Sequence, residues 1–298
     1  MDGNCGLHAA PPFRLASILR RMESLRLPTV SVIIPAYNEA RVIARCLGSL
    51  LDQTHRPHEI IVVDDGSTDG TRAIVRGFGG VMLLEQLHEG SGAARNRGAN
   101  AAAGDVLCFL DADMRFARDF LAHLVAPIAS EAAIGAFHAT EYVANPQERW
   151  ARLWNINQRL PITRKLPDDY PNRQAVFRAV RRDAFRAAGG FLAGGYDDDL
   201  SLAERLGTLA IVAPGAVCYH TNPARLREIY SHARWIGASA AVPQTRYEFW
   251  RYCPLNPRGK GWRALLRPGE RALPLFRLVY GAGICAGMLR ARRGRTAK

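Results

Sequence analysis

The stretch that decides the fold is VSVIIPAYNEARVIARCLGSLLDQT, residues 30–54. Its first five residues form a short, mostly β-branched apolar run, which is typical of a buried parallel strand. The run stops at Pro35. Apolar residues then recur over 42–51 with the spacing of an amphipathic helix. The segment therefore predicts a strand, a polar turn and a helix in succession.

The same order repeats along the first half of the chain. Further strands are predicted at residues 59–63, 81–84 and 105–110, and helices from about Thr68, over 90–104 and over 116–128. The pattern blurs afterwards, with strands expected at 134–144 and 209–213 and helices at 150–160 and from 223 past 235. Alternating strands and helices with short connections predict an α/β fold with a doubly wound, mostly parallel sheet.

Polar motifs follow three of the predicted strands directly. PAYNE begins at Pro35, DDGS at Asp64 and DAD at Asp111. In sheets of this kind ligands bind beyond the carboxyl ends of the strands. The sequence therefore places its unusual residues where the architecture predicts a site.

Asp111 and Asp113 are two positions apart. In an extended segment such side chains point to the same side, and two carboxylates sharing one place repel each other unless a cation joins them. Magnesium is held by one or two carboxylates together with substrate phosphates. By spacing alone a solvated turn is an equally good interpretation, but the position after an apolar strand favours a metal–diphosphate site.

Two further segments allow ligand contacts. Asp64 and Asp65 end the second strand, where they either serve the turn and the next helix cap or include one acid that meets a ligand. The segment GSGAARNRG offers backbone N–H groups and two arginines, Arg95 and Arg97, to a phosphate. The P-loop and Rossmann patterns are absent from it, which argues against kinases and NAD enzymes.

The overall composition limits the class of protein. The 298 residues are 48% hydrophobic and 22% charged, as in a globular protein of one large domain or two small ones. The formal charge of +13 is concentrated in residues 251–298, which hold 12 Lys and Arg against one acid, whereas residues 28–250 hold 24 of each sign. Such a basic tail favours an anionic surface.

The six cysteines have no CxxC spacing, so we expect free thiols in a reducing compartment rather than a zinc site. The N-terminal segment lacks the long apolar run of a signal peptide, so we expect none there. The apolar run 278–289 lies between Arg277 and Arg290 and is shorter than the ~20 residues of a membrane span. We expect a core helix or, slightly favoured, an interfacial helix followed by RARRGRTAK.

Four motifs together resemble those of the family 2 glycosyltransferases. They are VSVIIPAYNEARVIARCLGSLLDQT, EIIVVDDGSTDGT, GAARNRGANAAAGDVLCFLDAD and a later DDDLS. The resemblance is close over residues 30–113 and looser to about 235. It implies an inverting enzyme of the GT-A fold that uses a nucleotide-diphosphate sugar, with UDP or GDP as the nucleotide.

The resemblance also implies roles for individual residues. Tyr37 would lie near the base, Asp65 would accept a base N–H, and Asp111 would lie near the ribose. Asp113 would be the main ligand of Mg²⁺ or Mn²⁺, with Asp111 and His220 as further metal candidates. The nucleotide-sugar contacts implied in all are Pro35, Ala36, Tyr37, Glu39, Asp64, Asp65, Arg95, Asp111 and Ala112.

The general base of the family is the aspartate of an ED pair. Here the corresponding run is Tyr-Asp-Asp-Asp-Leu from Tyr196, so tyrosine replaces the glutamate. We favour Asp197 as the base, with Asp198 next, and interpret Asp199 as a helix-terminal acid. The processive members carry QxxRW, but Ser231 precedes Arg234 and Trp235 here, which disfavours a polysaccharide synthase.

These expectations define one favoured function and two alternatives. We expect a catalytic domain over 28–235, a basic helical extension over 236–298 and an unpatterned segment over 1–27. The enzyme would transfer sugar to a lipid- or glycan-linked hydroxyl, in the cytoplasm, as a peripheral protein on the inner face of the membrane. A polyprenyl-phosphate sugar synthase is the alternative. A non-enzymatic basic protein that binds membranes or nucleic acid is the remote alternative. For the favoured enzyme we expect no nucleic-acid partner.

Overall fold

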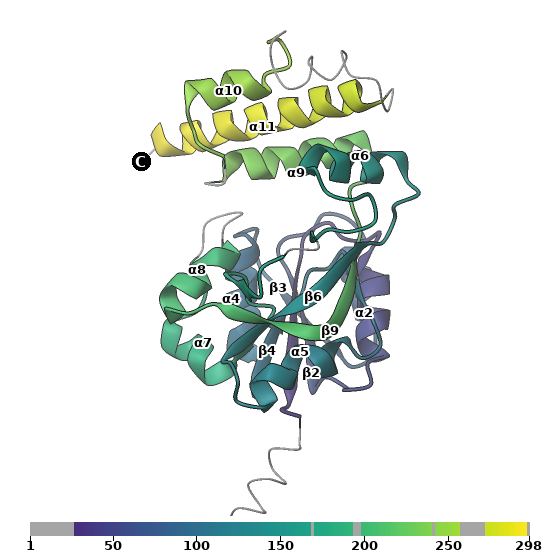
Figure 1. Cartoon of the computed structure of the whole chain (residues 1–298), viewed down its shortest axis with the longest axis vertical. Helices are drawn as coiled ribbons and strands as arrows, with labels where there is room; N and C mark the ends of the chain where they lie inside the picture. The colour runs from purple at the N-terminus through teal and green to yellow at the C-terminus, as the bar shows by residue number, and fades with distance from the viewer. Residues whose placement is uncertain (1–26, 168–169, 193–197, 240–241, 257–271, 297–298) are drawn as a thin grey trace, which may run out of the picture.

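The computed structural model describes residues 27–167, 170–192, 198–239, 242–256 and 272–296 (Figure 1). A mixed sheet with helices on both faces forms its larger part, and a layer of helices lies beyond one edge of that sheet. This confirms the predicted α/β class with a C-terminal helical part.

The first half of the sheet is parallel. Strands β1 (Val30–Ala36), β2 (Glu59–Asp64), β3 (Val81–Glu85) and β4 (Val106–Phe109) lie in the order β3-β2-β1-β4. Ala36 is level with Asp64, and Ile33 with Phe109. Because these strands run the same way, the PAYNE, DDGS and DAD segments all leave the sheet at one edge.

The second half of the sheet is mixed. Strand β8 (Ala179–Arg181) is antiparallel to β4 and to β6 (Gly135–Val143), and β6 is parallel to β9 (Ala210–His220). Strands β5 (Met114–Phe116) and β7 (Arg173–Gln174) pair antiparallel with β9. The helix expected from Phe116 begins instead at Phe120, because residues 114–116 pair with β9.

Helices cover both faces of the sheet. Helices α2 (Ile43–Leu51), α3 (Thr71–Arg76) and α5 (Phe120–Ala129) contribute to one core cluster, and α4 (Ser91–Ala101), α7 (Arg182–Ala188) and α8 (Asp198–Leu206) belong to the other face. Gly98 lets α4 lie close to the sheet, since a Cβ there would come within 2.5 Å of Ile33 Cγ2. This close packing fixes the start of α4 near the site edge.

The helical layer contains α6 (Arg149–Gln158), α9 (Leu226–Ala238), α10 (Arg246–Tyr252) and α11 (Leu273–Thr296) (Figure 1). Its core includes Trp154, Ile229 and Phe276. A Cβ at Gly287 would lie 2.1 Å from the carbonyl oxygen of Arg234, so glycine is required for the close approach of α11 to α9. The domain boundary expected at residue 235 falls inside α9 and stays a prediction.

Helix α11 is longer than the apolar run expected from the sequence. Its segment Leu273–Arg292 has 20 residues with a mean hydropathy of 1.2, which is long and apolar enough to cross a membrane by length and composition. The expectation of a core helix or an interfacial helix here stays a prediction. In the structure 39% of the segment is buried, and the core helix of a globular protein passes the same test.

Candidate active site

The acidic motifs meet at the carboxyl edge of the parallel strands, as the strand order requires. Asp111 and Asp113 follow β4, Glu39 follows β1, and Asp65 follows β2. Among the nucleotide-site candidates, Ala36 and Ala112 are buried, Pro35 and Glu39 are half-buried, and Tyr37 is exposed.

Asp111 lies between two arginines. Its Oδ1 is 3.1 Å from an Nη of Arg95, and its Oδ2 is 2.8 Å from an Nη of Arg178. Burial would raise the pKa of Asp111, but Arg178 and Arg95 together lower it to about 2. Asp111 is therefore a fixed negative charge. Arg178 was missed by sequence reasoning, because it lies in the second half of the chain, where no motif marks it.

Asp113 has one oxygen engaged and one unused. Its Oδ2 is 3.0 Å from Nε2 of His220, whereas its buried Oδ1 accepts no hydrogen bond from any residue that the structure describes. The residue borders a pocket of about 110 Å³. The lining of that pocket is Val42, Arg45, Asp113, Met114, Arg115, Ala144 and Thr221. A buried carboxylate oxygen without a partner fits a hard divalent cation.

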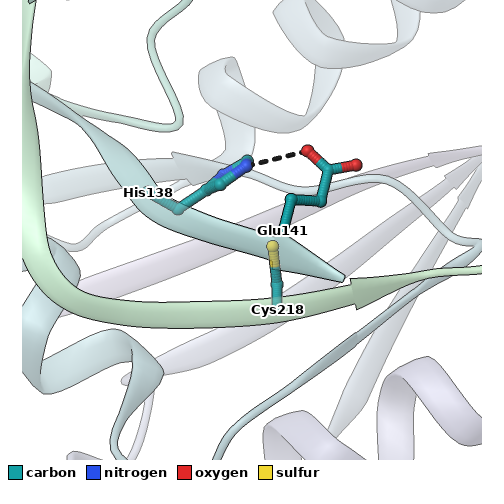
Figure 2. Close-up of side chains that lie close together, drawn as sticks. All are labelled: His138, Glu141 and Cys218. Atoms are coloured by element: carbon teal, nitrogen blue, oxygen red, sulfur yellow. Dashed lines mark hydrogen bonds and ion pairs between the residues drawn. The ribbon is translucent and has the colours of Figure 1, made fainter. Parts of the chain in front are cut away.

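His220 is held on its other side by a buried acid. Nδ1 of His220 is 2.6 Å from Oε1 of Glu141, whose Oε2 is 2.9 Å from Nε2 of His138. Figure 2 shows His138 and Glu141 meeting beside Cys218. Burial would lower the pKa of His220, but Asp113 and Glu141 raise it to about 9. Neither His138 nor Glu141 was predicted, because no local motif contains them.

Glu39 is the third acid of the site. Its backbone N–H donates to the Thr71 hydroxyl. Burial, together with the charges of Asp113 and Asp111, raises the pKa of Glu39 from 4.5 to about 8. The carboxylates of this edge therefore repel one another, and a bound cation would relieve that repulsion.

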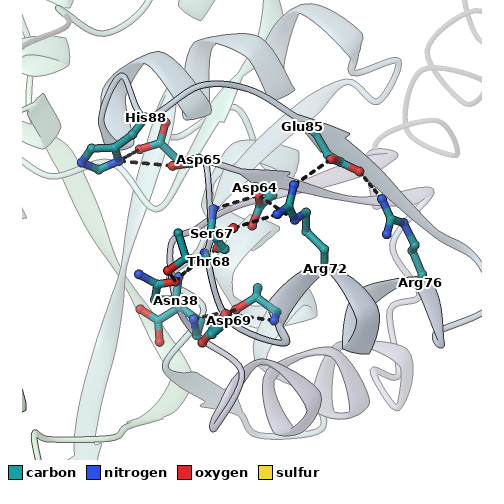
Figure 3. A network of polar contacts seen from close by, with 12 residues as sticks. Asn38, Asp64, Asp65, Ser67, Thr68, Asp69, Arg72, Arg76, Glu85 and His88 are labelled. Atoms are coloured by element: carbon teal, nitrogen blue, oxygen red, sulfur yellow. Dashed lines mark hydrogen bonds and ion pairs between the residues drawn. The ribbon is translucent and has the colours of Figure 1, made fainter.

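Asp64 and Asp65 have different surroundings (Figure 3). Asp65 accepts hydrogen bonds from the backbone N–H groups of Glu89 and Gly90 and from the Gln86 side chain, and it forms an ion pair with His88 at 2.8 Å. Asp64 accepts from the backbone N–H of Ser67 at 3.0 Å. Asp64 thus closes the turn, as the simpler interpretation expected.

An aromatic pair lies beside Asp65. The rings of Tyr37 and His88 are stacked, with centroids 4.2 Å apart, and both side chains are about half exposed. Asn38 next to Tyr37 has a φ of 59°, a left-handed conformation that asparagine tolerates better than most residues, and its Oδ1 accepts from the Thr68 N–H. The turn therefore presents the tyrosine ring at the site edge.

The predicted general bases are not placed by the structure. Asp197 lies outside the described residues, and Asp198 is described only as the first backbone residue of α8. Helix α8 packs beside α7 and α4 on one face of the sheet. The roles of Asp197 and Asp198 stay predictions.

Comparison with known proteins adds a family and a fold. Residues 31–189 match the family model "Glycosyl transferase family 2", which is more than half of the chain. The chain is 47% identical over 94 residues to glycosyltransferase AglE of Haloferax volcanii, a match that covers 29% of this chain and 31% of AglE. It is 32% identical over 162 residues to validoxylamine A glucosyltransferase of Streptomyces hygroscopicus, covering 51% and 33%. These matches span about a third of each relative.

Solved structures agree on the architecture. The mannosyltransferase PcManGT from Pyrobaculum calidifontis, in complex with GDP-Man and Mn²⁺, has a TM-score of 0.51 and 21% identity, covering 95% of this chain and 82% of its own. TarS of S. aureus in complex with UDP-GlcNAc has a TM-score of 0.53 and 17% identity, covering 91% and 92%. At these identities the likeness shows the fold.

The fold is that of the GT-A glycosyltransferases. The chain belongs to glycosyl transferase family 2. By family it is a transferase enzyme, and the fold and family expected from the sequence are confirmed.

Proposed function

We propose that the protein transfers a sugar, with inversion, from a nucleotide-diphosphate sugar to a hydroxyl of a lipid- or glycan-linked acceptor. The observation that supports this most is Asp113 beside Asp111 and Glu39, because one buried oxygen of Asp113 has no hydrogen-bond partner among the described residues. Relatives of the same fold are solved with GDP-Man and Mn²⁺ and with UDP-GlcNAc, which supports a UDP- or GDP-sugar as donor here.

Asp113 would hold Mg²⁺ or Mn²⁺, with His220 and Asp111 beside it. When bound, such a cation offsets the negative charge that grows on the leaving diphosphate. Asp111 stays ionised because Arg95 and Arg178 pair with it. Asp113 and Asp111 thus supply the negative charge that a cation needs. Arg95 and Arg178 add positive charge near the diphosphate.

The nucleoside would bind on the other side of the edge, at Tyr37 and Asp65. His88 now occupies this place, since its ring stacks on Tyr37 and pairs with Asp65. A planar base with an N–H offers the same two contacts, so we expect it to compete with His88. Pro35, Ala36 and Ala112 would lie around this site, whereas Asp64 is fully buried and closes the turn.

The acceptor separates the main proposal from its alternative. A hydroxyl acceptor needs a general base, which we assign to Asp197 or Asp198, whereas the phosphate of a polyprenyl phosphate does not. Replacing both aspartates by asparagine should abolish transfer to a hydroxyl. Retained transfer to a polyprenyl phosphate would favour the alternative function.

A cytoplasmic, peripheral membrane location is supported by the helical layer. Tyr247 and Trp250 on α10 are exposed at 72% and 54%, and aromatic side chains with a polar atom suit a membrane interface. The basic residues of 251–298 suit anionic lipid. Replacing Tyr247 and Trp250 by serine should lower binding to phosphatidylglycerol vesicles, and unchanged binding would remove this part of the proposal.

A thermal-shift panel tests the donor class. UDP, GDP and their sugars are added with Mn²⁺, with Mg²⁺ or with chelator, and we expect one nucleotide to stabilise the protein only when the metal is present. The Asp113→Asn variant should lose this stabilisation. Asp119→Asn is the matched control, because Asp119 is an exposed aspartate six residues away that should leave the response unchanged. Equal stabilisation with chelator would contradict the role of Asp113.

A further inference from the structure

A line of four side chains leads from the core of the sheet to the cation site. It runs from His138 through Glu141 and His220 to Asp113, with contacts of 2.9, 2.6 and 3.0 Å between successive polar atoms. His138 is fully buried and Glu141 is 6% exposed. Buried ionisable groups of this kind are costly unless paired, so the line is a specific structural arrangement.

The line lies where two strands pair irregularly. His138 and Glu141 are three apart on β6 and would point to opposite faces of a regular strand. Between His138 and Thr140, however, the register with β9 shifts from Ala213 to Val217, at a bulge that contains Gly215 with φ +82°. The extra residues lie in β9, and opposite them His138 and Glu141 meet on one side of β6 (Figure 2).

Both carboxylate oxygens of Glu141 are occupied by imidazole nitrogens. His138 donates its Nε2 hydrogen to one oxygen, and its Nδ1 has no partner among the described residues. The His138 ring is also stacked on Phe137, with centroids 4.1 Å apart. Glu141 is thus held in place and accepts the Nδ1 hydrogen of His220, which leaves Nε2 of His220 directed at Asp113, where a bound cation would replace the Nε2 hydrogen.

We propose, on the basis of the proposed function, that Glu141 and His138 are positioning residues that fix His220 as a cation ligand beside Asp113. A carboxylate behind a metal-binding histidine fixes the orientation of the ring and the nitrogen that faces the metal. His138 extends this by fixing the carboxylate itself. Neither residue touches the pocket, so both act through His220.

A rival interpretation is a separate metal centre formed by His138, Glu141 and Cys218, whose ligand atoms lie within 4.8 Å of one another. Two observations disfavour it. The Cys218 thiol donates to the carbonyl oxygen of Thr140, and burial raises the pKa of this thiol well above its ordinary value, which opposes the thiolate that a metal needs. Both oxygens of Glu141 are already used by histidines.

The test is Mn²⁺ binding to the full chain without nucleotide, measured by electron paramagnetic resonance. Glu141→Gln has only one accepting oxygen for two imidazole N–H groups, so we expect a roughly 10- to 100-fold weaker Mn²⁺ affinity. His138→Phe, which removes the donor, should weaken binding in the same direction. His138→Gln keeps an N–H donor and should restore most of the affinity, which a merely structural role would not predict.

Controls separate the possible failures. Cys218→Ala changes the same buried region without touching the line, and we expect unchanged Mn²⁺ affinity. Loss of one bound Mn²⁺ in Cys218→Ala would establish the rival centre and overturn the proposal. Wild-type Mn²⁺ affinity in Glu141→Gln, alongside loss in Asp113→Asn, would refute the positioning roles and leave the proposed function standing. Unchanged binding in Asp113→Asn would refute the proposed function itself. If Glu141→Gln does not fold, the two His138 variants decide.

Discussion

The acidic pair after β2 and the acidic pair after β4 lie at the same edge of the same sheet, yet their partners differ in kind. Asp65 is satisfied largely by the backbone N–H groups of Glu89 and Gly90, and Asp64 by that of Ser67. Asp111 and Asp113 are paired with side chains that come from up to 107 residues away. The first pair shapes a loop and, through Asp65, a proposed contact for the base, whereas the second holds charge that a cation can use.

The largest expected difference between the pairs is in metal response. Asp113→Asn should reduce transferase activity by about 10³-fold or more and abolish metal-dependent stabilisation by nucleotide, because it removes the oxygen proposed to hold the cation. Asp65→Asn should keep the metal dependence but weaken nucleotide binding, and it should lower the free energy of unfolding by about 1–3 kcal/mol, because backbone donors lose a charged acceptor. Activity assays and urea unfolding of both variants measure this. Metal dependence that survives in Asp113→Asn would break the comparison.

The ion pair between Asp111 and Arg178 can be removed by replacing the arginine. Arg178→Ala should lower the free energy of unfolding by roughly 2–4 kcal/mol, because a mostly buried carboxylate loses one of two cations while Arg95 remains. Arg181→Ala removes an exposed ion pair with Asp183 nearby and should cost about 0–1 kcal/mol. Equal losses in the two variants, measured by urea unfolding, would show that Asp111 does not depend on Arg178.

The proposed nucleoside site can be tested by replacing His88. His88→Ala frees the face of Tyr37 and one contact of Asp65, so nucleoside diphosphate should bind roughly 3- to 10-fold more tightly in isothermal titration. His58→Ala removes an exposed histidine just before β2 and is the control, with no change expected. Weaker binding in His88→Ala would mean that His88 adds to the bound base rather than competing with it.

Glu39 confers a pH dependence on the stability of the protein. Its pKa is raised from 4.5 to about 8 in the fold, so between these values the unfolded chain binds fewer protons than the native one. The free energy of unfolding therefore falls as pH rises through this window. Glu39→Gln should remove that slope, so its stability relative to wild type should increase from pH 5 to pH 9 in chelator. A constant difference across this range would contradict the burial and repulsion assigned to Glu39.

The local motifs accounted for much of the site. PAYNE, DDGS and DAD each follow a strand that is recognisable from its own residues, and the parallel order of β1, β2 and β4 brings them together. The partners of the acids were not foreseeable in the same way. Arg178, Glu141 and His138 lie in a region whose strands are two to eleven residues long and pair with both orientations, so no periodic pattern marks them.

By itself the sequence determined the α/β class, the family and the edge of the sheet where acids collect, because strand burial, turn chemistry and motif order are local properties. Only the tertiary structure decided which acid is neutralised and which keeps a free oxygen. That outcome depends on a bulge in β9 and on side chains far apart in the chain, and the energy of a buried charge is set by whatever the fold places within a few ångströms of it.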